Sequence, residues 1–211
     1  MRGVWFDNVH SYDDFNIVLS EVSIPPATPK TNFVDIPGGD GSIDQSEAQG
    51  EVRFNDRECS FTFTTLPTDD QEEKKQEISN AINGKRCKIR LDKDPDYYWY
   101  GRCWIDEYKS NKNINSIVVK ARVSPYKLKL NPTTVTVAAG TNVVKLLGNS
   151  RKTVVPTITT TAAATVVHSG NTYSLGAGNH KILNIQLVQG ENQVTVTSTA
   201  PVVFTYQEGD L

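Results

Sequence analysis

The sequence is poor in the residues on which most catalytic and metal-binding sites depend. Its 211 residues include three cysteines and three histidines. His10, His168 and His180 do not occur at the HxH or HExxH spacings of zinc sites. A Ser-His nucleophile at His168-Ser169 would also need a carboxylate and an oxyanion hole, and acidic residues are scarce in that half of the chain. We therefore expect no catalytic residues, no metal site and no cofactor.

Long apolar runs and blocks of like charge are also absent. No stretch reaches the roughly 18–20 apolar residues of a membrane-spanning helix, and the opening MRGVWFDNVHSYDDF lacks the apolar core of a secretory signal. Lys and Arg number 22 against 24 Asp and Glu, which gives a net charge of −2. This balance does not attract polyanions. We expect no membrane partner and no specific nucleic-acid binding.

The cysteines are too few for a disulfide framework and do not form a CxxC motif. Cys59, Cys87 and Cys103 each lie in a strand-like run. We expect buried free thiols that pack as small hydrophobic side chains.

What the chain does have is a change in composition near residue 131. All three tryptophans and most of the charged residues precede this point, and Thr, Val, Ala and Gly dominate after it. Asn131-Pro132 marks a turn at the change. We expect two domains, residues 1–130 and residues 131–211.

The most regular pattern is CKIRLDKDPDYYWYGRCWIDEYKSN. Cys87, Ile89 and Leu91 alternate with basic residues, and a second alternating run follows the DKDPD turn. Period-2 alternation around a turn predicts a β-hairpin. The turn begins like a calcium-binding EF-hand loop, but Tyr97 and Cys103 replace the required glycine and glutamate.

Aromatic residues gather on the second strand of this hairpin, in the run Tyr97 to Tyr100 and at Trp104. Alternation sends about half of them to each face of the sheet. One face is core. The other face is either an exposed contact surface or is covered by a helix.

One helix is predicted over residues 68–84. Thr68 and Gln71 fit a capping box, Ile78 and Ile82 lie on one apolar stripe, and Asn83-Gly84 ends the helix.

Short strands account for the rest of both parts. In the first part they are expected at Val4–Asn8, Phe15–Val22, Glu51–Thr65 and Ile117–Val123. The second part shows strands separated by turns every 8–12 residues, which is typical of a β-sandwich. These strands are expected at Thr133–Ala138, Val143–Leu147, Thr157–Thr161, Ala164–His168, His180–Val188, Gln193–Thr199 and Val202–Gln207.

Between the second and third of these strands lies a long connection, Pro25 to Gly50. It contains four prolines and four glycines and shows little sustained periodicity. A connection of this length in a compact domain is usually functional or disordered. Its GGDG segment lacks the Lys-Ser/Thr of a phosphate-binding loop. We interpret the whole connection from Pro25 to Gly50 as an extended arm.

Six segments, in this order, resemble the distal tail protein (Dit) family of long-tailed phages. They are GVWFDNVHSYDDFNIVL, VDIPGGDGSIDQSEAQGEVRFNDRECSFTF, LDKDPDYYWYGR, VKARVSPYKLKL, GNSRKTVVPTITTTAAA and LVQGENQVTVTSTAPVVFTYQEGDL. Each segment is short, but their shared order is specific. The resemblance covers nearly the whole chain.

This resemblance implies a mainly β fold. It consists of an N-terminal β-barrel-like or sandwich-like domain with one helix and a C-terminal galectin-like β-sandwich. It also implies a structural virion protein, not an enzyme. Six copies would form a ring that joins the tail tube to the baseplate or fibre and surrounds the DNA channel. The partners would be tube, lysin, fibre or receptor-binding proteins. The protein would assemble in the host cytoplasm and reside at the tail tip.

In such a ring each subunit uses two different surfaces, and the arm is suited to reach a neighbour. The residues expected at the subunit interface are Phe33, Val34, Ile36, Pro37, Gly38, Gly39, Asp40, Gly41, Ile43 and Asp44. The alternative function is a carbohydrate-binding module that contacts the host cell wall. Its sugar site would need an exposed aromatic residue in the second domain, where Tyr173, Phe204 and Tyr206 are the candidates. Phe204 and Tyr206 share one strand face and are expected to pack inward.

Overall fold

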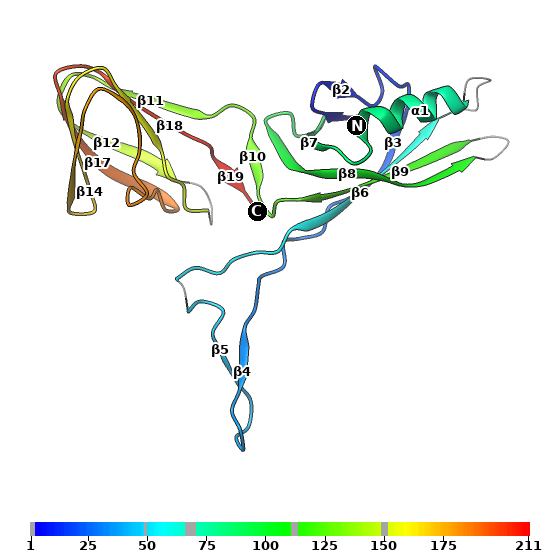
Figure 1. Ribbon diagram of the computed structural model, residues 1–211, viewed down its shortest axis with the longest axis horizontal. Coiled ribbons are helices and arrows are strands. Elements are labelled where there is room, and N and C mark those ends of the chain that lie inside the picture. Colours follow the sequence, from blue (N-terminus) through cyan, green and yellow to red (C-terminus); the bar gives the residue numbers. More distant parts are fainter. Residues whose placement is uncertain (1–2, 49, 66–70, 111–113, 149–151) are drawn as a thin grey trace. The chain divides into compact units, whose positions relative to one another are not determined.

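The computed structural model describes residues 3–48, 50–65, 71–110, 114–148 and 152–211, except for the side chain of Gln71 (Figure 1). The chain forms two compact units, Met1–Pro125 and Tyr126–Leu211. Antiparallel strands make up most of both units, and the described residues contain one α-helix. The predicted mainly β fold with one helix is therefore confirmed.

Unit 1 is built on a curled antiparallel sheet whose strands follow the order β2-β1-β7-β8-β9-β6-β3. The strands are β1 (Val4–Phe6), β2 (Val9–His10), β3 (Val18–Ser23), β6 (Arg57–Thr65), β7 (Arg86–Leu91), β8 (Tyr97–Ser110) and β9 (Asn115–Val123). The predicted hairpin is β7-β8, with Cys87 opposite Gly101 and Ile89 opposite Trp99. Alternation turns the apolar residues of each strand to one face, where they form the core.

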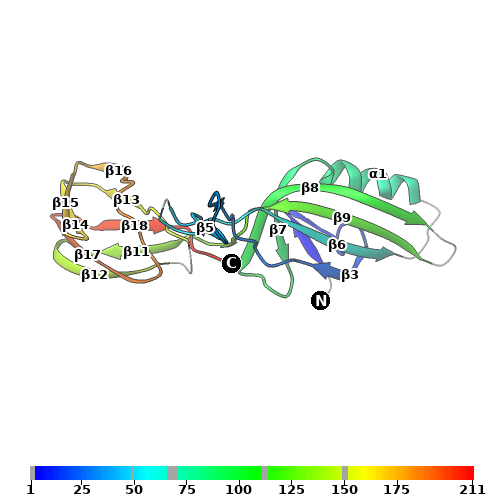
Figure 2. The ribbon, with the colours of Figure 1, turned by 90° about the horizontal axis from the view of Figure 1, so that it is seen from below.

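The helix α1 (Gln71–Ile82) packs against β8 and closes this core (Figure 2). Ile78 and Ile82, the predicted apolar stripe, are buried among the residues of the sheet. Gly84 has a φ of 75°, as the predicted C-terminal glycine requires. Thr68, the expected cap, lies outside the described residues.

Unit 2 is a sandwich of two four-stranded sheets, ordered β11-β18-β13-β16 and β12-β17-β14-β15. The strands are β11 (Thr133–Val137), β12 (Gly140–Gly148), β13 (Thr157–Thr160), β14 (Ala164–His168), β15 (Asn171–Leu175), β16 (Gly178–Lys181), β17 (Gly190–Ser198) and β18 (Val202–Tyr206). Residues from both sheets, such as Ile158, Phe204, Val166 and Val196, form one buried core. Short strands β10 (Lys127–Lys129) and β19 (Gly209–Asp210) pair the two ends of the unit.

Several predicted strand boundaries are wrong. The strand expected at His180–Val188 ends at Lys181, and the chain then turns so that the amide of Ile185 donates to the carbonyl of Ile182 at 3.0 Å. Ile185 and Leu187 are buried without being in a strand. Their spacing in the sequence is that of a strand, and it misled the prediction. The sequence prediction also missed β15, in which only Tyr173 and Leu175 turn toward the core and the other three residues are polar and exposed.

Candidate interaction site on the arm

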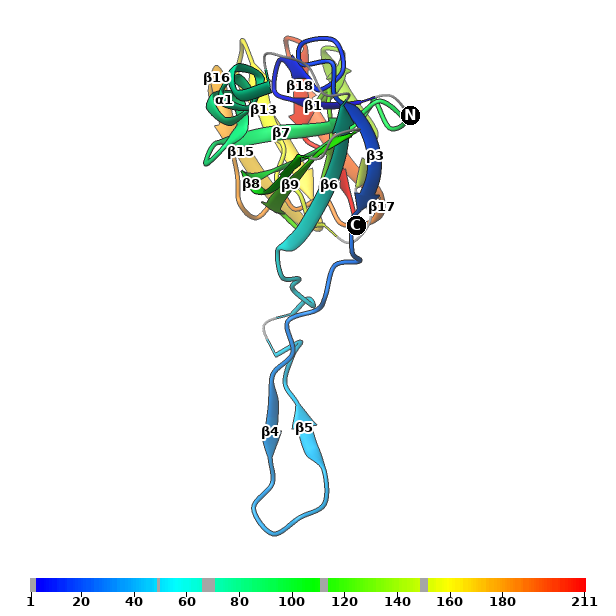
Figure 3. The same cartoon turned by 90° about the vertical axis from the view of Figure 1, so that its right-hand side faces the viewer.

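The arm contains a β-hairpin, made by β4 (Phe33–Asp35) and β5 (Ser42–Asp44), and is joined to the ends of β3 and β6 (Figure 3). The sequence prediction missed these strands because Pro and Gly residues interrupt the pattern. The hairpin register places Phe33 opposite Asp44 and Val34 opposite Ile43. The part of the arm from Phe33 to Asp44 is therefore a hairpin and not an irregular loop.

Polar contacts close the base of the hairpin. The amide of Gln45 donates to the carbonyl of Asn32 at 2.8 Å, and the amide of Asn32 donates to the Ser46 hydroxyl at 2.9 Å. Ser46 in turn donates to the Asp44 carboxylate through its amide and its hydroxyl. These hydrogen bonds hold the pKa of Asp44 below its usual value. Since a two-stranded hairpin is marginal by itself in water, these contacts help to keep the arm in one conformation.

The tip of the hairpin depends on two glycines. Gly38 and Gly41 have φ values of 75° and 78°, a region that side chains rarely adopt. The amide of Gly39 donates to the carbonyl of Ile36 at 3.1 Å. The Gly-rich segment therefore encodes a tight turn.

The two faces of the hairpin differ in chemistry. Residues that are opposite in an antiparallel pair share a face, so Val34 and Ile43 form an aliphatic face. Phe33, Asp35 and Asp44 share the other face, which is aromatic and acidic. The exposed fractions of the Phe33 and Ile43 side chains are 58% and 51%.

All ten residues predicted to lie at a subunit interface are exposed in the single chain. Exposed apolar side chains of this number on one small hairpin are typical of a protein contact. Their contact with another subunit stays a prediction.

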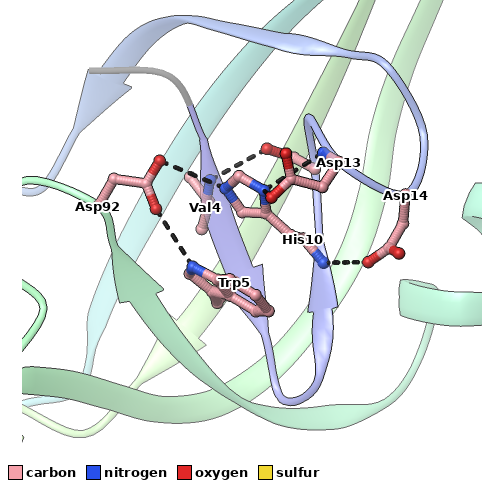
Figure 4. Close-up of polar contacts among 7 residues, drawn as sticks. Val4, Trp5, His10, Asp13, Asp14 and Asp92 are labelled. Carbon is pink, nitrogen blue, oxygen red and sulfur yellow. Dashed lines mark hydrogen bonds and ion pairs between the residues drawn. The ribbon is translucent and has the colours of Figure 1, made fainter.

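A second polar cluster surrounds His10 and joins the N-terminal strands to the DKDPD turn (Figure 4). His10 is buried; its Nδ1 lies 2.6 Å from a carboxylate oxygen of Asp13, and its Nε2 lies 3.3 Å from one of Asp92. Trp5 stacks on the imidazole at a centroid distance of 4.6 Å and donates its indole N–H to Asp92 at 3.2 Å. Sequence reasoning did not associate these residues, because Asp92 is far from His10 along the chain. The cluster ties the turn to the N-terminal strands, and the Ser11 hydroxyl beside it accepts from the amide of Val4 at 3.0 Å.

The other histidines also have structural partners. The ring of His168 contacts the carbonyls of Gln186 and Gln193, and the ring of His180 contacts that of Gly176. Among the described residues, no three His, Cys, Asp or Glu side chains form a group that could hold a metal ion. The helix content of the described residues includes no segment with the length and hydrophobicity of a membrane span.

The open question about the aromatic residues of β8 is answered by their burial. Trp99 is buried in the core, whereas Tyr100 is 43% exposed and Trp104 is half-buried. Side chains alternate between the two faces along a strand, so Tyr100 and Trp104 lie on the face opposite to Trp99. The face opposite to the core and to α1 therefore presents Tyr100 and part of Trp104 to solvent, whereas Tyr98 is buried.

The aromatic side chains of unit 2 are less exposed to solvent than Tyr100 of β8. Phe204 and Tyr206 are buried in the core, as expected, and Tyr173 packs half-buried against it. No aromatic ring of unit 2 belongs to the strongly exposed apolar residues of the described chain.

Comparison with known proteins gives one informative result. No family model matches the sequence, and no curated protein matches it. A crystal structure does match: that of SPP1 Dit (gp 19.1), described as a paradigm of the hub adsorption apparatus in phages that infect Gram-positive bacteria. The match covers 100% of both chains with a TM-score of 0.72 and 14% sequence identity. The mainly β fold that the sequence resemblance implied is therefore confirmed, and this chain shares the fold of the SPP1 Dit protein over its whole length.

Proposed function

We propose that this protein is a structural hub at the distal end of a phage tail. The observation that carries the proposal is the match to SPP1 Dit, because it spans 100% of both chains and so includes both units of this one. The match agrees with the six sequence segments that resemble the Dit family. A fold can host several functions, so the role itself needs a direct test.

In this proposal six copies form a closed ring that joins the tail tube to the baseplate or fibre and surrounds the DNA channel. Unit 1 forms the ring, and the arm of each copy contacts its neighbour. Unit 2, proposed to be galectin-like, serves as a docking platform for tube, lysin, fibre or receptor-binding proteins. The protein assembles in the bacterial cytoplasm and then resides in the virion.

The exposed apolar residues of the arm support this arrangement. Phe33, Val34, Ile36 and Ile43 are between 42% and 58% exposed, and burying them against another chain would be favourable. A ring interface uses two different surfaces of each subunit. The arm supplies one of them.

The test is the mass and shape of the purified protein. Light scattering should give six times the 23.4 kDa chain mass, and negative-stain images should show rings with six-fold symmetry. A monomer at every concentration from roughly micromolar to millimolar, with no rings in the images, would overturn the hexameric hub.

A further inference from the structure

Three arginines lie in one row on the solvent face of the sheet in unit 1. Arg86 is directly opposite Arg102 across β7 and β8, and Arg102 is directly opposite Arg122 across β8 and β9. All three are exposed. Like charges at opposite positions destabilise a sheet, so this row is unfavourable for the single chain and suits a negatively charged occupant.

The row lies in a cleft of about 510 Å³. Asp56 is the one carboxylate among the lining residues, and it binds the Nε of Arg122 at 3.1 Å. Arg102 donates to the backbone carbonyl of Gly84, which orients its guanidinium without neutralising it. Tyr100 and Trp104 complete the lining. The cleft therefore offers guanidinium groups together with aromatic surface.

The arm has the complementary chemistry. From Thr31 to Val52 the chain contains five acidic residues and no lysine or arginine. One face of the hairpin combines the ring of Phe33 with the carboxylates of Asp35 and Asp44. Carboxylates form strong, often bidentate, hydrogen bonds with guanidinium groups, and an aromatic ring packs against Tyr, Trp or Arg.

Both surfaces are open in the single chain, since the arm residues and the three arginines are all exposed. The arm of the same chain therefore leaves the cleft free for a group from outside the chain. A second copy always supplies an arm. An arm and a cleft are different surfaces, which is the condition for a closed ring.

We infer that the aromatic and acidic face of the arm docks into the arginine cleft of the neighbouring copy. This inference rests on the proposed ring and names the two surfaces that meet in it. The aliphatic face, Val34 and Ile43, is left for other contacts in the assembly.

The first experiment reverses charges on each side of the contact in the full chain. The R86E/R102E variant and the D35K/D44K variant should each weaken assembly at least about tenfold, measured by light scattering over a concentration series. The variant with all four changes should recover most of the loss. The K93E/K181E variant changes the charge equally at two exposed lysines outside the cleft and should assemble like the wild type. Circular dichroism and thermal unfolding verify that each variant is folded.

A second experiment does not depend on ring formation. Because the arms would fill the clefts of the assembled wild type, a fluorescent, cyclised peptide of residues 31–48 is titrated into the variant that lacks Pro37 to Asp44, alone and with each charge change, and its anisotropy is followed. Binding should be lost in R86E/R102E, be retained in K93E/K181E and weaken as salt screens the charges. A DNA oligonucleotide of the same charge serves as the competing anion.

The outcomes separate the two proposals. Rings that form normally in R86E/R102E and D35K/D44K, with no peptide binding, overturn the arm-cleft contact and leave the hub intact. Peptide binding without rings supports the contact and counts against the hub. Absence of both rejects both. Tighter binding of the oligonucleotide, lost in R86E/R102E, assigns the cleft to nucleic acid and overturns our inference.

Discussion

The Sγ atoms of Cys87 and Cys103 lie 3.2 Å apart in the core of unit 1. Both cysteines are buried, and both are free thiols, as is Cys59. The contact with Cys87 and the burial of the site raise the pKa of Cys103, while the same contact lowers the pKa of Cys87. The predicted role of the cysteines as buried free thiols is confirmed.

We expect the native protein to resist thiol reagents. The thiolate is the reactive form, and burial keeps the reagent out and raises the pKa of Cys59 to about 11. With 5,5′-dithiobis(2-nitrobenzoic acid) near neutral pH, the folded chain should react far more slowly than the chain in guanidinium, where all three thiols are accessible. Rapid reaction of the folded protein would show that the core of unit 1 opens readily.

The buried thiol of Cys59 should make the folded chain less stable at alkaline pH. Burial raises the pKa of Cys59 from its ordinary 9.0 to about 11, so between these values the folded state keeps a proton that the unfolded state has released. The free energy of unfolding is therefore unaffected by this thiol below pH 9. It falls by roughly 2–3 kcal/mol as the pH rises from 9 through 11. Urea unfolding at pH 8, 9 and 10.5 measures it.

A matched control separates this thiol from the tyrosines that titrate nearby. Burial raises the pKa of Tyr98 and Tyr206 as well, and their contribution is lost above pH 10. The C59A variant should show a weaker loss of stability between pH 9 and pH 10.5 than the wild type. An identical pH profile in both proteins would contradict the role of Cys59.

Much of the fold follows from local pattern. The hairpin β7-β8 and the helix α1 were predictable because alternation, a turn and a C-terminal glycine all indicate the same structure. The region from His180 to Val188 was not, because buried apolar residues in a turn give the same pattern as a strand. A short strand such as β15 was not predictable either, because Tyr173 and Leu175 are its only apolar residues.

The candidate site shows a similar division. Composition identified the arm and its exposed apolar residues, but its hairpin depends on Ser46 and Asn32 contacts that no periodicity reveals. The arginine row was not predictable, because Arg86, Arg102 and Arg122 meet only through the register of three strands. The register between strands that are far apart in the sequence is fixed by the packing of the whole sheet.

The His10 cluster should contribute to the stability of unit 1. Replacing His10 with alanine removes the stacking partner of Trp5 and leaves the Asp92 carboxylate without its imidazole contact. We expect a loss of about 1–3 kcal/mol in the free energy of unfolding, measured by urea denaturation. The H180A variant, which changes an imidazole that contacts one exposed carbonyl, should lose much less. Equal losses in the free energy of unfolding in the two variants would show that the His10 cluster does not stabilise unit 1 more than an exposed histidine does.

Deletion of Pro37 to Asp44 removes the tip of the arm and β5 but none of the core of either unit. We expect the variant to fold and to unfold cooperatively, but to assemble more weakly than the wild type and to lose the part of its melting temperature that assembly contributes. Light scattering and thermal unfolding measure the two properties. Wild-type assembly of the deletion variant would assign the arm another role, and loss of folding would show that the arm contributes to the core.

The last prediction concerns sugar binding by unit 2. Sugar sites commonly place an aromatic ring against the carbohydrate, and the rings of Phe204 and Tyr206 are buried while Tyr173 is packed against the core. We expect the full chain to give no signal above background on a glycan array, consistent with a docking platform for proteins. The Y173A variant is the control, because Tyr173 is the least buried of the three rings. Strong binding to one class of sugar that is lost in Y173A would replace the docking role with the carbohydrate-binding alternative, and it would place the sugar on β15.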